Sequence, residues 1–229
     1  MPLTAMILAA GRGERMRPLT DHTPKPLLQA GGKPLIVWQI EKLARAGFSR
    51  IVINHAHLGD QIEETLGNGH ALGVSIAYSA EAPAALETAG GIAKALPLLG
   101  DTPFAVVNGD VFCEFDYARL AQTVTNMPAT DLAHLVLVDN PEHNPAGDFS
   151  LAGTRLTDSG PRFTFSGIGV YRPALFAAVP AGQPAKLAPL LRQAISADQV
   201  GGEHSQAYWL DVGTPQRLQQ LDQHLKEMH

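Results

Sequence analysis

Two glycines and a group of cations share one short segment near the start of the chain. Gly11 and Gly13 stand two residues apart in GRGERMRPLTDHTPKP, and the cations are Arg12, Arg15, Arg17 and Lys25. Glycines let backbone N–H groups approach an anion closely, because a Cβ would block both the conformation and the approach. Prolines restrict the segment, so Lys25 is expected to be held in place. The pattern predicts a loop that binds a polyphosphate.

Two familiar phosphate-binding motifs do not fit this loop. The dinucleotide motif G-x-G-x-x-G requires a third glycine where Met16 stands, and the pattern G-x-x-x-x-G-K-[ST] has no match. An ordinary tight turn remains an alternative for the two glycines alone, but a turn does not require the surrounding cations.

Two aspartates follow apolar runs that have the character of buried strands. Asp110 ends the run VVNGD, and Asp211 lies in WLDVGTP. Mg²⁺ takes one or two protein carboxylates, and phosphate oxygens and water complete its octahedron. A turn or a helix cap is the alternative for either aspartate alone. Together with the glycine loop, the pair predicts a magnesium site.

The segments that must position these residues alternate between apolar runs and stretches of helical period. Strands are expected at residues 4–10, 50–54, 74–79, 104–108 and 131–138, and helices at 34–47, 59–67, 88–99 and 116–124. Such alternation implies parallel strands joined by right-handed crossovers. The predicted fold class is therefore α/β, with a doubly wound, mostly parallel, Rossmann-like sheet.

The pattern is less regular after residue 138. We expect loops and antiparallel pieces up to residue 171, helices at 173–179 and 187–195, and a strand at 207–210. The closing helix is expected to begin with Thr214 as its N-cap and Pro215 as its first residue, and to bury Leu218, Leu221 and Leu225. We expect one domain of residues 1–229, with no further domain after this helix.

Composition excludes some classes of partner. The 229 residues carry a formal net charge of −5 and only 6% aromatic residues, which disfavours a nucleic acid polymer as ligand. The single cysteine, Cys113, cannot form an internal disulfide, and no apolar run is long enough to cross a membrane. We therefore expect a cytoplasmic protein without a membrane partner.

Four motifs, taken in order across nearly the whole chain, resemble the signature of the sugar-phosphate nucleotidyltransferases. They are LAAGRGERMRPLTDHTPKPL, VNGD, LETAGGI and LDVGTP. The resemblance implies the doubly wound sheet, Mg²⁺ as cofactor, and transfer of a nucleotidyl group from an NTP to a sugar 1-phosphate with release of pyrophosphate. It also implies a nucleotide-binding half, residues 1–138, and a sugar-binding half, residues 139–229.

The resemblance also implies a role for individual residues. The triphosphate loop is Ala10, Gly11, Gly13 and Arg15, and Lys25 lies against the phosphates. The base is contacted by Glu81, Ala89, Gly90 and Gly91, and Asn108 lies beside the ribose or the metal. The sugar is held by Gly147, Asp148 and Gly167, and the metal by Asp110 and Asp211. The catalytic residues are Lys25, Arg15 and Asp110.

Three further segments bear on the substrates. INHAHLGDQIE, HNPAGDF and FSGIGVY resemble family members that use UTP and N-acetylmuramic acid 1-phosphate in peptidoglycan recycling. GTP with mannose 1-phosphate and dTTP with glucose 1-phosphate remain open. A nucleotide-binding regulator without catalysis is the alternative of another class, although a binder has no need of Lys25, Asp110 and Asp211 together.

The sequence departs from the family pattern at the residue that holds the sugar phosphate. Many relatives carry a Glu-Lys-Pro triplet whose lysine holds this phosphate, and TRLTDSGPRFTFSG has no such triplet. Arg15, Lys186 and Arg192 are candidates for the missing cation by charge alone. The oligomeric state stays open, with a monomer expected.

We expect no catalytic or metal-binding role for His55, His57, His143 or Cys113. His55 and His57 have the alternate spacing of two strand-end ligands, but a third ligand is not evident, so a polar loop beside the base is expected. His143 is expected to be a loop residue, with contact to the sugar as the alternative. Cys113 is expected to be inert packing.

Overall fold

A computed structural model describes residues 2–82 and 84–228. Its strands are β1 (Leu3–Leu8), β2 (Gln29–Ala30), β3 (Lys33–Pro34), β4 (Phe48–His55), β5 (Ser75–Ala80), β6 (Phe104–Asn108), β7 (Val111–Cys113), β8 (Ala133–Val138), β9 (Phe149–Ala152), β10 (Arg155–Thr157), β11 (Arg162–Tyr171), β12 (Val200–Ser205) and β13 (Trp209–Asp211). The α-helices are α1 (Leu35–Arg45), α2 (Gly59–Leu66), α3 (Glu87–Leu99), α4 (Tyr117–Asn126), α5 (Leu187–Ser196) and α6 (Pro215–Glu227). Short 3₁₀ turns lie at Glu14–Met16, Leu19–Asp21, Lys25–Leu27, His70–Leu72 and Pro173–Phe176.

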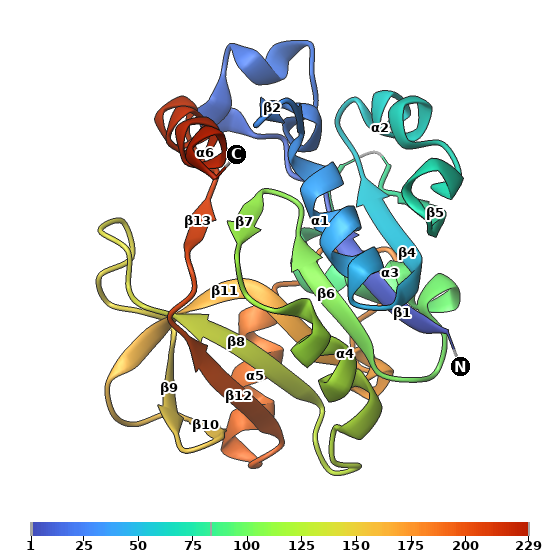
Figure 1. The fold of residues 1–229 in the computed structure, drawn as a ribbon. Helices are drawn as coiled ribbons and strands as arrows, with labels where there is room; N and C mark the ends of the chain where they lie inside the picture. Colours follow the sequence, from blue (N-terminus) through green and yellow to red (C-terminus); the bar gives the residue numbers. More distant parts are fainter. Residues whose placement is uncertain (1, 83, 229) are drawn as a thin grey trace.

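One nine-stranded sheet organises the described residues (Figure 1). Its strand order is β5-β4-β1-β6-β11-β8-β12-β10-β9. The pairs β5–β4, β4–β1, β1–β6 and β8–β12 are parallel. β11 runs antiparallel to both β6 and β8, and β9 and β10 also pair antiparallel. The predicted α/β class is confirmed, and the parallel strands are concentrated in the N-terminal half of a mixed sheet.

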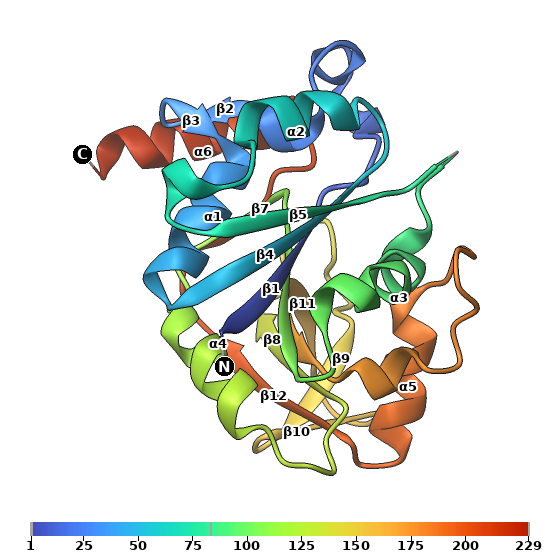
Figure 2. The same ribbon diagram turned by 90° about the vertical axis from the view of Figure 1, so that its right-hand side faces the viewer.

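Helices cover both faces of this sheet, as a doubly wound fold requires (Figure 2). Side chains of successive strand residues point to opposite faces, so Ile7 faces one apolar cluster and Met6 the other. The first cluster contains residues of α1 and α4, and the second contains residues of α3 and α5. Ile7 and Met6 are completely buried, and burial of such a side chain contributes about 1.5–3 kcal/mol.

The closing helix α6 packs away from the main sheet, against β2 and the segment that follows the glycine loop (Figure 1). Leu221 and Leu225 are buried in a third cluster with Trp38 and Met16, whereas Leu218 is partly buried. The predicted N-cap is confirmed, because the Thr214 hydroxyl accepts a hydrogen bond from the Arg217 N–H at 3.3 Å. This cap fixes the first turn of α6, and with it Arg217.

Several elements differ from the expectations. β12 was not expected, and the helix expected at 173–179 is only a 3₁₀ turn over Pro173–Phe176. Pro180 disfavours the helical conformation at Val179, the residue before it, which shortens the helix that can form here. The strand expected at 131–138 begins at Ala133, and the strand expected at 207–210 is Trp209–Asp211. None of the described helices is long and apolar enough to cross a membrane.

Candidate active site

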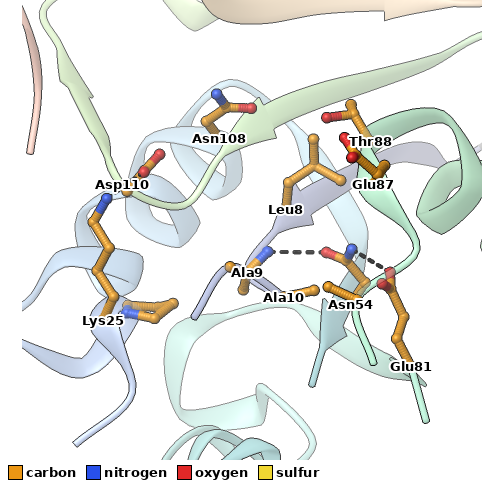
Figure 3. A pocket seen from close by; sticks show the side chains of 13 residues that line it. Leu8, Ala9, Ala10, Lys25, Asn54, Glu81, Glu87, Thr88, Asn108 and Asp110 are labelled. Atoms are coloured by element: carbon orange, nitrogen blue, oxygen red, sulfur yellow. Dashed lines mark hydrogen bonds and ion pairs between the residues drawn. The ribbon is translucent and has the colours of Figure 1, made fainter. Parts of the chain in front are cut away.

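A cavity of about 270 Å³ lies where the parallel strands β1, β4 and β6 end (Figure 3). The strand ends contribute Leu8, Asn54 and Asn108 to its lining. The other lining residues are Ala9, Ala10, Gly11, Lys25, Pro26, Glu81, Ala85, Glu87, Thr88 and Asp110. The carboxyl ends of parallel strands are the usual ligand site of an open α/β sheet. The fold thus gathers one cavity from residues more than 80 positions apart, and we call it the inner cavity.

The glycine loop folds into two 3₁₀ turns whose outer charges are paired. Arg12 lies 3.5 Å from Asp21, and Arg17 lies 3.2 Å from Glu14 and 3.3 Å from Asp21. Arg12 also donates to the Thr20 carbonyl oxygen at 2.7 Å. Two of the four cations therefore hold the loop together and are not directed at a ligand in the inner cavity.

The structure gives a different reason for a glycine at each of the two positions, Gly11 and Gly13. Gly13 has a φ of 69°, and a Cβ there would lie 3.0 Å from the Thr20 Cγ2 atom, so the turn itself requires glycine. A Cβ at Gly11 would meet nothing within 4 Å, and Gly11 lines the inner cavity. The space beside Gly11 is therefore available for a ligand to approach its backbone.

Substitution of these two glycines should separate the two roles. Gly11→Ala should leave the melting temperature unchanged and raise the KM for the nucleotide by about tenfold, because the new methyl group occupies ligand space. Gly13→Ala should lower the free energy of unfolding by about 1–2 kcal/mol, the usual cost of the left-handed conformation for an alanine. Thermal melts and initial rates on both variants check this; a destabilised Gly11→Ala would show that Gly11 is also needed for folding.

Lys25 and Asp110 form an ion pair at the edge of the inner cavity. Lys25 is 8% exposed, and its Nζ lies 2.5 Å from the Asp110 Oδ2 atom. Figure 3 shows the lysine side chain extending toward the carboxylate. The 3₁₀ turn Lys25–Leu27 between Pro24 and Leu28 fixes the lysine backbone, as the prolines of the sequence suggest. A buried cation is thus held at the carboxyl end of β6.

Asp211 lies beside Asp110 because β13 pairs with β7. Asp211 is in register with Val111, and the Val212 N–H donates to the Asp110 carbonyl oxygen at 2.7 Å. The Asp211 carboxylate is bound by the Arg217 guanidinium, and its Oδ1 atom lies 3.2 Å from the His143 Nε2 atom. The structure therefore places Asp211 at the end of β13 and Asp110 in the turn just before β7, the strand that pairs with β13, and each carboxylate lies next to a cationic side chain.

The two aspartates fit a magnesium ion by the chemistry of their donors. Each supplies hard carboxylate oxygens, which Mg²⁺ prefers. In residues 2–82 and 84–228, no group of three or more His, Cys, Asp or Glu side chains is placed to hold a metal. A site with two carboxylates suits a cation whose remaining ligands are phosphate oxygens and water.

Arg15 lies close to this second aspartate. A Cβ at Gly213 would be 3.0 Å from the Arg15 guanidinium and 3.3 Å from the Asp211 Oδ2 atom. Arg15 is exposed, and it reaches across from the glycine loop to the turn before α6. This places a cation of the loop on the Asp211 side of the site.

Asn54 and Glu81 connect three segments of the inner cavity. The Ala9 N–H donates to the Asn54 Oδ1 atom at 2.9 Å, and the Asn54 amide donates to the Glu81 Oε1 atom at 2.6 Å (Figure 3). The Leu86 N–H donates to the Glu81 Oε2 atom at 2.6 Å. Glu81 is 3% exposed, so its charge is compensated by these donors. The network fixes the end of β1 relative to the start of α3.

The residues expected at the base have structural partners of their own. The N–H groups of Ala89 and Gly90 both donate to the Ala185 carbonyl oxygen, at 2.9 and 3.2 Å. A Cβ at Gly91 would lie 2.4 Å from the Glu81 Oε1 atom. Glu81 lines the inner cavity, whereas these three residues are not part of the described lining. Their contact with a base stays a prediction.

A second cavity, of about 320 Å³, shares Glu87, Thr88 and Asn108 with the first; we call it the outer cavity. Its other lining residues are Asp148, Phe149, Phe165, Lys186, Leu187, Ala188, Leu191 and Arg192. Asp148 is held in place because its Oδ2 atom accepts the Phe165 N–H at 2.8 Å and the Asn144 amide at 3.2 Å. Asp148 is therefore fixed in position to contact a ligand in the outer cavity.

Gly147 and Gly167 support this region through their backbones. A Cβ at Gly167 would lie 2.5 Å from the Asn108 Nδ2 atom, so this glycine lets Asn108 pack against β11. Gly147 has a φ of 62° in the turn before Asp148. Neither glycine is among the described lining residues of the outer cavity, and their contact with a sugar stays a prediction.

His55, His57 and Cys113 have environments that do not involve the predicted metal ligands. The His55 Nε2 atom lies 2.7 Å from Glu63, and the His57 Nε2 atom lies 3.1 Å from the Thr20 carbonyl oxygen. The two rings thus contact different groups. Burial raises the pKa of the Cys113 thiol, so the thiol stays protonated at neutral pH.

Two site residues, Asn54 and Arg217, were missed in the sequence, and His143 was expected as a loop residue with contact to the sugar as the alternative. Asn54 is the last residue but one of the buried strand β4, so the reasoning from strand ends that identified Asp110 also applies to it. Arg217 lies one helical turn after the predicted N-cap Thr214, and this position only weakly indicates that its side chain reaches the site. His143 lies in an irregular loop, and its approach to Asp211 depends on a loop path that local sequence does not specify.

The mixed α/β sheet and the glycine loop after β1 fit the class of protein that the sequence motifs resemble. A family model described as nucleotidyl transferase matches residues 4–151, and the chain belongs to this family.

Individual relatives narrow the comparison. The chain is 57% identical to the N-acetylmuramate alpha-1-phosphate uridylyltransferase of Neisseria meningitidis serogroup B, over 95% of this chain and 96% of the relative. It is 34% identical to the protein of the same name from Caulobacter vibrioides, over 94% and 93% of the two chains. A solved structure of apo-UDP-glucose pyrophosphorylase has a TM-score of 0.79 at 16% identity, over 100% of this chain and 99% of that chain, which shows a shared fold.

Proposed function

We propose that the protein transfers the uridylyl group of UTP to N-acetylmuramic acid α-1-phosphate, giving UDP-N-acetylmuramic acid and pyrophosphate. The observation that carries this proposal is the 57% identity, over 95% of the chain, to the Neisseria relative of that name. Two adjoining cavities that share Asn108 and Thr88 support it, because the reaction needs a nucleotide and a sugar phosphate side by side. Such a reaction belongs to peptidoglycan recycling, and a cytoplasmic setting stays a prediction.

The transfer requires one P–O bond to form and one to break. An oxygen of the sugar 1-phosphate attacks the α-phosphorus of UTP, and the bond from that phosphorus to the bridging oxygen of the β-phosphate breaks. The sugar phosphate is already an anion, so no strong general base is needed. The protein must hold the reactants in line and balance the negative charge that gathers at the α-phosphate.

The chain's own residues divide this work. Lys25, buried and fixed at the cavity edge, supplies a positive charge to the phosphates, and the open side of Gly11 lets its backbone approach them. Asp110 and Asp211 would hold Mg²⁺, which when bound neutralises phosphate charge and favours departure of pyrophosphate. Residues 1–138 would bind the nucleotide and residues 139–229 the sugar, within a single domain.

Pyrophosphate release with separate substrate pairs tests this assignment. In Mg²⁺, kcat/KM for UTP with N-acetylmuramic acid α-1-phosphate should exceed that for GTP with mannose 1-phosphate or dTTP with glucose 1-phosphate by at least about a hundredfold. Preference for another pair would mean that the substrates are assigned wrongly, whereas the assignment of the reaction type would remain. No release with any pair would favour a nucleotide-binding regulator.

A further inference from the structure

Two cations line the outer cavity without a carboxylate partner. Lys186 and Arg192 both line it, and the ion pairs among residues 2–82 and 84–228 include neither of them. By contrast, Arg155 and Arg217 are each held by an aspartate. Neither cation lies within ion-pair distance of a carboxylate in the described part of the chain, although Glu87 and Asp148 line the same cavity, so both cations are available to bind an anion.

Their place in the cavity separates them from the reacting phosphates. The boundary between the two cavities is formed by Glu87, Thr88 and Asn108, and Lys25 lines only the inner one. Lys186 and Arg192 line only the outer one. An anion that they bind would therefore lie in the outer cavity, which Lys25 does not line.

Backbone hydrogen bonds connect the segment before Lys186 to the start of α3, beside the inner cavity. The Ala185 N–H donates to the Leu86 carbonyl oxygen at 3.0 Å, and the Ala185 carbonyl oxygen accepts from Ala89 and Gly90. A Cβ at Gly90 would lie 2.4 Å from the Gln183 carbonyl oxygen, so this close approach requires glycine. Hydrogen bonds on both sides of Ala185 thus set the position of the next residue, Lys186, relative to the start of α3.

The outer cavity also has an apolar wall and two carboxylates. Phe149, Phe165 and Leu191 offer surfaces for methyl groups. The carboxylate of Asp148 is occupied in part by the Phe165 N–H and the Asn144 amide. Asp148 and Glu87 would repel a second anion if the two cations were absent.

We propose that Lys186 and Arg192 bind the carboxylate of the lactyl ether on O3 of the sugar, and so select sugar 1-phosphates that carry a second anion. The inference rests on the proposed function, because N-acetylmuramic acid differs from N-acetylglucosamine by this lactyl group. A site built to bind a substrate group rejects an analogue that lacks it, since its own polar groups are then left without a partner.

The test combines charge-neutral variants with a charge-neutral substrate. Lys186→Gln and Arg192→Gln are assayed with UTP and either N-acetylmuramic acid α-1-phosphate or its lactyl methyl ester. In the wild type the acid should be preferred over the ester by about tenfold or more, as expected for a charged hydrogen bond. Each variant should reduce this preference toward one, mainly through KM for the acid. Lys226→Gln, an exposed lysine on α6, is the matched control and should keep the wild-type ratio.

Three outcomes would overturn the inference. An equal loss on acid and ester would show that the cations hold the 1-phosphate common to both. An unchanged ratio in both variants would show that they do not touch the carboxylate. A wild type that turns over sugar 1-phosphates without a second anionic group, but not N-acetylmuramic acid α-1-phosphate, would contradict the proposed function as well. This result would be seen before any variant is made.

Discussion

Asp110→Asn is expected to lower the rate of pyrophosphate release by about a thousandfold or more, since a bound metal supplies several kcal/mol of charge stabilisation. The asparagine keeps the size of the side chain but loses the charge that would hold Mg²⁺ and that now pairs with Lys25 at 2.5 Å. Asp211→Asn should have an effect of similar size, because β13 places it beside Asp110. Initial rates at saturating Mg²⁺ measure both.

The control for these variants is Asp101→Asn. Asp101 is exposed and lies before the start of β6, at the end of the strand opposite to Asp110. It should keep the wild-type rate. Normal rates in both site variants would mean that the two aspartates are not the metal ligands, whereas a lowered melting temperature would assign the loss to folding and require the same assay on folded protein at lower temperature.

Lys25→Met should lower kcat by about a hundredfold or more and raise the KM for UTP by less than tenfold, because a fixed charge acts most where charge develops in the transition state. Methionine has nearly the length of lysine and should fill the same buried space. Single-turnover rates and nucleotide binding separate the two quantities. Equal losses in rate and in binding would mean that Lys25 only holds the ground-state phosphates.

Arg17→Met is the matched control in the same loop. Arg17 carries the same charge, but it lies on the outside of the loop and pairs with Glu14 and Asp21. It should change kcat less than threefold, because exposed ion pairs contribute about 0–1 kcal/mol. If Arg17→Met matched Lys25→Met, net charge of the loop rather than the position of one lysine would explain the effect.

The α/β order of the N-terminal half was predictable because each element has its own period. Strands such as Phe104–Asn108 are continuous apolar runs, and helices such as α1 repeat apolar residues at helical spacing. β12 was not predictable in this way, since VGGEHS contains two glycines, which usually weaken a strand. A Cβ at Gly202 would lie 2.1 Å from the Leu156 Cδ1 atom, so tertiary packing, which local sequence does not reveal, requires glycine there.

The candidate site was predictable where it depends on strand ends. Asn108 and Asp110 could be placed because a parallel sheet brings strand ends to one edge, and Lys25 because it belongs to the basic segment that follows the first strand. These three residues do line one cavity. His143 and Arg217 could not be placed, because their contact with Asp211 depends on an irregular loop and on the path of β13 into α6. The two cations of the outer cavity were candidates by charge only, until the structure placed them together.

The most direct test of the central claim is a competition. Wild-type protein and Mg²⁺ are mixed with equal amounts of UTP, GTP and dTTP and of N-acetylmuramic acid α-1-phosphate, mannose 1-phosphate and glucose 1-phosphate, and the products are identified by mass spectrometry. The predicted result is UDP-N-acetylmuramic acid as the main product, in an amount equal to the pyrophosphate released. Another nucleotide sugar as the main product would contradict the proposed choice of substrates. Consumption of triphosphate without formation of any nucleotide sugar would contradict the proposed transfer reaction itself.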